Sequence, residues 1–154
     1  MTADSPDELA LLPRLAQLST AINRGRLTQQ ATEATGLALD RPAMTILLTL
    51  SMADSALRVG EIADRMQVVG PHVTRQVQAL EQRGLVRRVT DPNDRRASLI
   101  EATETGTEAA NRYTATIVDW FRGVIADWPE NDRTELGRLL GKLADDITTR
   151  LNQP

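Results

Sequence analysis

Hydrophobic residues recur every three or four positions near both ends of the chain, which is the spacing of an amphipathic helix. Residues 5–8 read Ser-Pro-Asp-Glu, the pattern of a capping box, and begin a helix predicted over about residues 5–30. Two further helices are predicted over about residues 103–127 and 129–151. The last carries an apolar stripe that is expected to face inward: Leu136, Leu139, Leu140, Leu143, Ile147 and Leu151.

The middle of the chain predicts three shorter helices and a β-hairpin. The helices cover about residues 40–55, 60–66 and 70–84, and the last opens on a Gly-Pro pair and ends at a glycine. Residues 85–90 and 97–102 alternate between apolar and polar positions on either side of a turn, so they predict two paired strands. The helix over 40–55 is apolar nearly all round and is expected to be buried through Met44, Ile46, Leu47, Leu48, Leu50 and Met52.

This order of elements is that of a winged helix-turn-helix. The predicted fold is therefore mainly α, with the small β-hairpin as the wing and the helix over 70–84 as the recognition helix. The tip of the wing reads Asp-Pro-Asn-Asp-Arg-Arg over residues 91–96. A tight turn only has to be polar, so the pair Arg95 and Arg96 indicates that the tip meets a nucleic-acid groove or a phosphate.

The recognition helix combines an apolar face with a polar one. Val73, Val77 and Leu80 fall together at about 100° per residue and are expected to face the core. The opposite face gathers Pro71, Arg75, Gln78 and Gln82, with Thr74 and Ala79 beside them and His72 in the first turn. Arg, Gln and Thr side chains can read guanine, adenine and thymine in a major groove. A solvated helix surface would look the same in isolation, and the neighbouring turn and wing favour DNA binding.

The charge distribution supports this interpretation. The chain has 154 residues and a net charge of −3, which by itself argues against nucleic acid. Residues 70–98, however, hold six arginines against three acidic residues, a net charge of +3, while the rest of the chain carries −6. A basic segment in an acidic body is expected of a domain that presents one face to phosphates.

Several other function classes are excluded by composition. The chain has no cysteine and one histidine, His72, so it offers no disulfide, thiolate zinc site, His-rich metal site or catalytic triad, and we expect no metal and no cofactor. Its carboxylates scatter along helix surfaces, without a phosphate-binding glycine loop, so enzymatic activity is not expected. No apolar run approaches the roughly 18 residues that span a membrane. The acidic N-terminus does not resemble a signal peptide, which predicts a cytoplasmic protein.

Residues 70–106, GPHVTRQVQALEQRGLVRRVTDPNDRRASLIEATETG, resemble the core of the MarR family of transcriptional regulators. The shared features are the T-R pair in the recognition helix, the L-E-x-x-G-L-V exit, the D-P-x-D-R-R wing and the T-x-x-G that opens the next helix. The resemblance is specific over about residues 58–106, and the helical order before and after fits the whole chain.

The family resemblance implies both an assembly and a function. A single MarR-like domain over residues 1–154 would hold a DNA-binding core at about 40–102 and dimerisation helices at about 5–30 and 104–151. The homodimer would bind a pseudo-palindromic operator on double-stranded DNA, usually as a repressor, and a small aromatic effector would release it. A rival interpretation is a protein-interaction module in which the wing arginines contact an acidic partner, and competition by duplex DNA separates the two.

The resemblance also implies which residues contact DNA. In the recognition helix, the positions that meet the major groove and its phosphates are Pro71, His72, Thr74, Arg75, Gln76 and Gln78. In the wing, Asp94 matches the aspartate that orients the following arginine. Arg95 matches the arginine that enters the minor groove, and Arg96 matches one that braces the wing or contacts the DNA backbone.

Two departures from the family pattern bear on these assignments. Arg58 stands where the family commonly has a Ser or Thr that caps the helix, so either this cap is weaker or Arg58 contacts a phosphate. His72 and Gln76 are not typical of the family, so the operator sequence cannot be inferred by analogy.

The aromatic residues raise the question of an effector site. Tyr113, Trp120, Phe121 and Trp128 are all the aromatic residues of the chain, and all are placed on the long helix that starts near Thr103. Their rings could line an effector pocket. Packing in a dimer core is the favoured interpretation, because apolar residues at helical spacing are usually core. The residues that would bind an effector stay unassigned.

Overall fold

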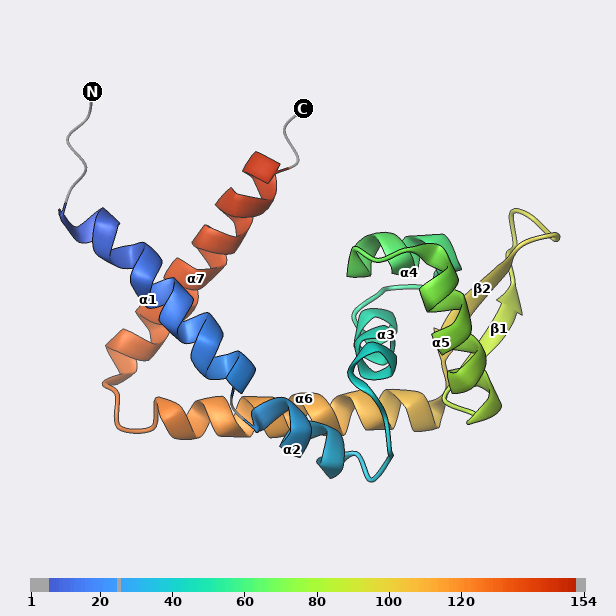
Figure 1. Cartoon of the computed structure of the whole chain (residues 1–154), viewed down its shortest axis with the longest axis horizontal. Helices are drawn as coiled ribbons and strands as arrows, with labels where there is room; N and C mark the ends of the chain where they lie inside the picture. The colour runs from blue at the N-terminus through green and yellow to red at the C-terminus, as the bar shows by residue number, and fades with distance from the viewer. Residues whose placement is uncertain (1–5, 25, 152–154) are drawn as a thin grey trace. The chain divides into compact units, whose positions relative to one another are not determined.

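Figure 1 shows a computed structural model of the chain, which describes residues 6–24 and 26–151. In chain order its elements are α1 (Pro6–Arg24), α2 (Leu27–Ala34), α3 (Arg41–Ser51), α4 (Val59–Met66), α5 (Gly70–Gln82), β1 (Val86–Thr90), β2 (Ser98–Ala102), α6 (Glu104–Val124) and α7 (Glu130–Leu151). The fold is mainly α with one antiparallel hairpin, so the predicted fold class is confirmed. Ser5, the predicted N-cap of the first helix, lies outside the described residues. The chain divides into two compact units, one up to Ile117 and one from Val118 onward.

The core of the first unit forms around α3, which packs against α4, α5 and β2. Asp40 caps this helix, because its Oδ1 accepts a hydrogen bond from the Ala43 N–H at 2.8 Å. Ile46 and Leu47 are fully buried, as the sequence predicted. The prediction was wrong for Met52, which is 85% exposed, because α3 ends at Ser51 and Met52 lies in the cap beyond the buried face.

A short turn between α4 and α5 completes the helix-turn-helix. Gln67 ends α4 in the left-handed conformation, with a φ of 54°, and redirects the chain toward α5. The predicted inner face of α5 is confirmed, since Val73, Val77 and Leu80 are all buried. Gly84 follows the end of α5 with a φ of +70°, which a glycine adopts without steric cost.

The wing is the hairpin of β1 and β2, in which Val86 pairs with Ala102 and Thr90 pairs with Ser98. Val86 and Ile100 are buried and attach the hairpin to the core. Leu57, just before α4, forms an isolated antiparallel bridge with Ile100 of β2. The wing is therefore joined at its base to the segment that opens the helix-turn-helix.

The T-x-x-G motif fastens the wing to α6. The Thr103 hydroxyl donates to the Gly84 carbonyl at 2.7 Å and accepts from the Gly106 N–H at 3.1 Å, so it caps α6 and binds the end of the recognition helix. A Cβ atom at Gly106 would collide with the carbonyl oxygen of Leu85. The motif thus combines a helix cap with a close approach of two backbones.

The N-terminal region differs from the prediction of one helix over 5–30. Helix α1 ends at Arg24, and a separate helix, α2, buries Leu27 and Ala31. Thr35 ends α2 with a hydroxyl that donates to the Thr32 carbonyl, and Gly36 follows in the left-handed region with a φ of +71°. A second difference concerns α6, which ends at Val124, so Trp128 lies beyond the long helix.

The second unit holds the end of α6 and all of α7. None of the described residues of α7 is buried, and Leu139, Leu140 and Ile147 are each close to half exposed. In the first unit, α1 likewise leaves Leu12 and Leu18 exposed. The predicted apolar stripes therefore have no cover within the single chain as far as it is described. None of the described helices has the length and apolar content that crossing a membrane requires.

Candidate nucleic-acid interface

The outer face of α5 is the first part of the candidate interface. Pro71, Arg75, Gln78 and Gln82 are all exposed on it, opposite the buried valines. Within the described residues, the Arg75 guanidinium makes no hydrogen bond or ion pair with another side chain. A planar group with five donors is therefore available on the face that the sequence predicted for base reading.

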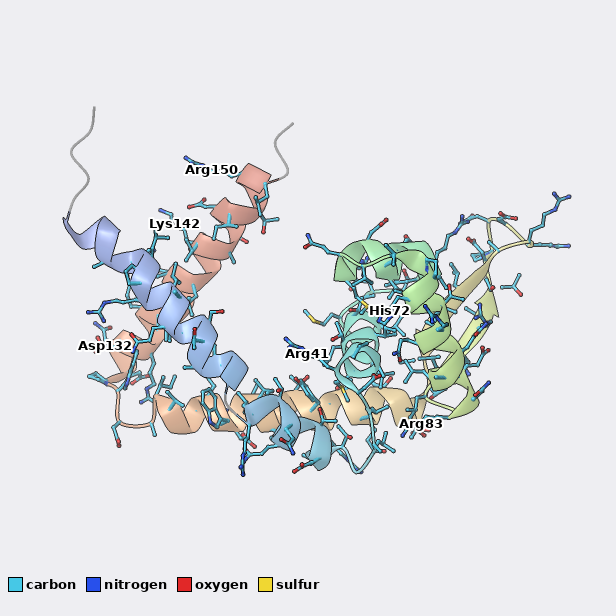
Figure 2. The ribbon with its side chains drawn as sticks, viewed as in Figure 1. Arg41, His72, Arg83, Asp132, Lys142 and Arg150 are labelled. Atoms are coloured by element: carbon cyan, nitrogen blue, oxygen red, sulfur yellow. The ribbon has the colours of Figure 1, made fainter. Side chains whose placement is uncertain are left out.

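The N-terminus of α5 is open. Val69 occupies the N-cap position and makes no side-chain cap, and Pro71 lacks an N–H. His72, labelled in Figure 2, lies half-buried in the first turn, and its backbone N–H donates to the Val69 carbonyl at 3.1 Å. The positive end of a helix dipole without an acidic residue in its first turn suits a nearby phosphate.

Two of the predicted contact residues on α5 are engaged inside the protein. The Thr74 hydroxyl donates to the Gly70 carbonyl at 3.1 Å. The Gln76 amide donates to Oδ2 of Asp40 at 3.2 Å, which ties the recognition helix to the cap of α3. Both side chains are partly buried, so the structure separates Thr74 and Gln76 from the exposed face that carries Arg75 and Gln78.

The tip of the wing is the second part of the interface, and it extends away from α3, α4 and α5 (Figure 1). Arg95 and Arg96 are exposed, and their guanidinium groups have no partner among the described residues. Oδ1 of Asp94 accepts a hydrogen bond from the Arg96 backbone N–H at 3.0 Å, and the Asp94 carbonyl accepts from Ala97 at 2.9 Å. Asp94 thus shapes the backbone of the turn, and it makes no hydrogen bond to the Arg95 side chain.

The remaining arginines of residues 70–98 are bound within the fold. Arg83, labelled in Figure 2, donates to the Ala38 carbonyl at 2.7 Å. Arg87 pairs with Glu101 across the hairpin, and Arg88 pairs with Glu81 of α5 at 3.1 Å. The unpaired positive charge of residues 70–98 therefore lies on Arg75 of α5 and on Arg95 and Arg96 of the wing tip, which are exposed to solvent.

An ion pair at the start of the wing tip was not predicted. Nε and Nη2 of Arg58 donate to Oδ2 of Asp91 at 3.1 and 2.6 Å. The Asn93 N–H donates to the other Asp91 oxygen at 2.8 Å. This backbone hydrogen bond and the Arg58 guanidinium hold the pKa of Asp91 below its ordinary value, and Asp91 raises the pKa of Arg58.

Sequence reasoning treated Asp91 only as a turn residue, because its partner lies 33 positions away. The one available indication was Arg58 itself, which stands at an N-cap although an arginine has no acceptor with which to cap a helix. Glu61, in the first turn of α4, forms the cap instead, because its carboxylate accepts a hydrogen bond from the Arg58 backbone N–H at 2.6 Å.

A helix-turn-helix with an exposed polar face on its recognition helix and an arginine-tipped hairpin defines a winged-helix DNA-binding protein. The MarR family model matches residues 39–98, from the cap of α3 to the start of β2. The chain is a DNA-binding transcriptional regulator, a class distinct from enzymes, and it is similar to the MarR family over these residues.

Similar proteins agree with this assignment. The HTH-type transcriptional regulator YxaD of Bacillus subtilis (strain 168) is 28% identical over 127 residues, which cover 82% of this chain and 87% of that protein. The structure of a MarR family protein from Bacillus stearothermophilus matches with a TM-score of 0.76 and 23% identity, over 95% of this chain and 99% of the other. A mutant of S. aureus MepR bound to an oligodeoxyribonucleotide matches with a TM-score of 0.60 and 21% identity, over 86% and 97% of the two chains.

Proposed function

We propose that the protein is a homodimeric repressor, one MarR-like domain over residues 1–154, that binds a pseudo-palindromic operator. The proposal rests on the guanidinium groups of Arg75, Arg95 and Arg96, which make no hydrogen bond or ion pair in the described part of the chain. The other arginines of residues 70–98 are bound within the fold. The S. aureus MepR mutant, whose fold is similar, is bound to an oligodeoxyribonucleotide in its structure. As a regulator of operator DNA it would act in the cytoplasm.

Each part of the interface takes a different role in this proposal. Arg75 and Gln78 read base edges in the major groove, while Pro71 and His72 approach phosphates at the open end of α5. Arg95 enters the minor groove and Arg96 contacts the DNA backbone. Asp94, Thr74, Gln76 and Arg58 support these contacts from within the protein.

Dimerisation would bring two such interfaces to one operator. The exposed apolar stripes of α1 and α7, together with Trp120 and Phe121 near the end of α6, supply surface for a partner chain. A two-fold dimer of this kind reads two half-sites related by the same symmetry, which is why a pseudo-palindrome is expected.

A cavity of about 520 Å³ in the first unit is the candidate effector site. It lies among α2, the start of α3 and Tyr113 of α6, and its size is ordinary for a small-molecule site. Arg41, labelled in Figure 2, contributes a guanidinium without a partner in the described part of the chain. The Tyr113 ring and this cation suit a small aromatic acid.

The cavity also offers a route to the recognition helix. Ala38 and Leu39 line it, and the Ala38 carbonyl accepts from Arg83, just past the end of α5. Asp40, the next residue, accepts from Gln76. A ligand that displaces this segment would therefore move α5 and weaken DNA binding, provided that it binds the displaced arrangement more tightly.

The test of the proposed function is a selection of DNA duplexes from a random pool, followed by fluorescence anisotropy with the enriched sequence and a scrambled control. We expect a pseudo-palindromic site, bound with a large preference at physiological salt. Equal affinity for both duplexes would contradict operator binding, and no binding to duplex DNA would favour a protein partner for the wing.

The effector is tested separately, by thermal-shift screening of small aromatic acids against wild type and Arg41→Ala. We expect a ligand that stabilises the wild type and releases the operator, while Arg41→Ala keeps operator binding and loses the response. A ligand that releases DNA equally from both proteins would place the effector site elsewhere.

A further inference from the structure

The Arg58–Asp91 ion pair joins the start of α4, in the helix-turn-helix, to the wing tip. We propose that Arg58 is a positioning residue: through Asp91 it fixes the first residue of the wing tip against the start of α4 and so sets where Arg95 and Arg96 lie in relation to the recognition helix. The inference rests on the proposed DNA-binding function and deepens it. It assigns to Arg58 a role through the wing in place of a phosphate contact.

The Arg58 side of the pair is anchored twice. Leu57 exchanges two backbone hydrogen bonds with Ile100 of β2, at 2.9 and 2.7 Å. The Arg58 N–H donates to Glu61 at 2.6 Å in the first turn of α4. The backbone at Arg58 is therefore held both by the hairpin and by the helix-turn-helix. This fixes the point from which the Arg58 side chain extends toward Asp91.

The Asp91 side of the pair organises the turn. Asp91 is 5% exposed, and its carboxylate accepts from Arg58 and from the Asn93 N–H. Its backbone N–H donates to the Ala97 carbonyl at 3.1 Å, and its carbonyl accepts from Asp94 at 3.3 Å. The residue thus holds both ends of the loop that carries Arg95 and Arg96.

The pair would be costly to break from one side. A carboxylate as buried as that of Asp91 depends on its partners, and removal of the Arg58 guanidinium would leave it with one backbone donor. The turn would be expected to rearrange until water reaches the carboxylate. Such a rearrangement moves the two wing arginines, whose guanidinium groups make no hydrogen bond or ion pair in the described part of the chain.

A direct phosphate contact by Arg58 makes the opposite prediction for its partner. The guanidinium is half exposed, so a phosphate could reach it. If Arg58 served only that contact, removing the charge of Asp91 would free the guanidinium and remove a repulsive acid, and DNA would bind more tightly. If the pair positions the wing, the same change weakens binding.

The variants are Asp91→Asn and Asp94→Asn in the full-length protein. Both remove one negative charge from the same turn with little change of shape, and an asparagine at either position can still accept the backbone hydrogen bond seen here. Simple electrostatics predicts similar effects for the two. Positioning by the ion pair predicts that Asp91→Asn binds the operator roughly tenfold more weakly than Asp94→Asn does.

A double-mutant cycle shows whether the effect passes through the wing. We expect Arg95→Ala to cost much less affinity in the Asp91→Asn background than in wild type, and Arg75→Ala on α5 to cost the same in both. Arg58→Ala should couple to Arg95→Ala in the same way. A general loss of stability would lower all affinities without this selective coupling.

Anisotropy titrations with the selected duplex at fixed salt decide the matter, and thermal unfolding of each variant confirms that it is folded. Unchanged or tighter binding by Asp91→Asn, or losses of affinity that simply add to those of Arg95→Ala, would overturn the positioning role of Arg58. The proposed function is judged separately, by whether the wild-type protein binds the operator. Hydrogen exchange of the amides in residues 91–97 gives a second readout on the free protein. Faster exchange in Asp91→Asn than in wild type and Asp94→Asn supports the positioning role, and unchanged exchange in Asp91→Asn opposes it.

Discussion

At the scale of single residues, the interface depends on which arginines the fold leaves unbound. Arg83, Arg87 and Arg88 are held by a carbonyl or a carboxylate, and Arg75, Arg95 and Arg96 are not. An unbound guanidinium loses no internal partner when it reaches DNA, whereas a paired one would have to exchange contacts. The two groups therefore have different expected effects when they are replaced.

Replacement of Arg75 should reduce sequence discrimination. If Arg75 pairs with a base, Arg75→Ala should lose about 1–3 kcal/mol of preference for operator over scrambled DNA per half-site. Arg88→Ala removes the same charge from a residue that is bound to Glu81, and should leave the preference nearly unchanged. An unchanged ratio of affinities in Arg75→Ala would assign that residue to a phosphate.

Replacement of Arg95 should change the salt dependence of binding. Arg95→Ala should flatten the slope of log affinity against log salt by about one phosphate equivalent per subunit. Asp94→Ala should weaken binding although it removes an acid, because the turn loses its hydrogen bond to the Arg96 N–H. Titrations across a range of salt concentrations measure both, and tighter binding by Asp94→Ala would leave the wing as a plain charged loop.

The lowered pKa of Asp91 predicts how its contribution to stability depends on pH. A carboxyl group whose pKa in the folded protein lies below its ordinary 3.8 favours folding at every pH above that value. The contribution is lost as the pH falls below 3.8 and through the lowered pKa, where the folded protein also takes up the proton. Urea unfolding should show wild type more stable than Asp91→Asn at pH 7, with a gap that narrows below pH 3.8.

Individual contacts were only partly accessible to sequence reasoning. The free arginines of the wing tip followed from their place in a polar turn, which needs no knowledge of distant residues. The Arg58–Asp91 pair and the Gln76–Asp40 hydrogen bond join residues 33 and 36 positions apart, and no local pattern marks such partners. Periodicity places Gln76 on the side of α5 but cannot show what packs against that side.

At the scale of elements, helix boundaries followed the sequence where apolar spacing and end residues agreed. Helices α3, α4 and α5 and the hairpin lie close to their predicted ranges. The separate helix α2 was missed because the prediction extended one helix to about residue 30, although Leu27 comes five positions after Ile22 and does not continue the apolar stripe of α1. In the sequence, the end of α2 is marked only by Gly36. The structure shows that this glycine has a left-handed φ.

The junction between the recognition helix and α6 gives a prediction for stability. Gly106→Ala places a methyl group against the Leu85 carbonyl, so it should destabilise the protein by about 1–3 kcal/mol. Gly60→Ala in α4 is the control, because a Cβ there meets no atom within 4 Å and should be neutral or stabilising by up to about 1 kcal/mol. Equal unfolding midpoints in urea for the two variants would contradict the close packing at Gly106.

At the scale of the whole molecule, the exposed stripes predict association. Leu12, Leu18, Leu140 and Ile147 are between 49% and 69% exposed in the single chain, which is unusual for side chains at helical spacing. Sedimentation should therefore show a dimer at micromolar concentration, and Leu140→Glu should shift it toward monomer. A wild-type protein that stays monomeric would refute dimerisation through these helices.

The same stripes have a genetic consequence. If chains associate through α1 and α7, a chain that carries Arg75→Ala and Arg95→Ala still pairs with an intact chain, because the substitutions leave the apolar residues untouched. Each mixed dimer then holds one competent half, and a two-fold operator gains little from it. Co-expression of the altered chain in excess should relieve repression of a reporter by the intact chain, whereas adding Leu140→Glu to the altered chain should remove this interference.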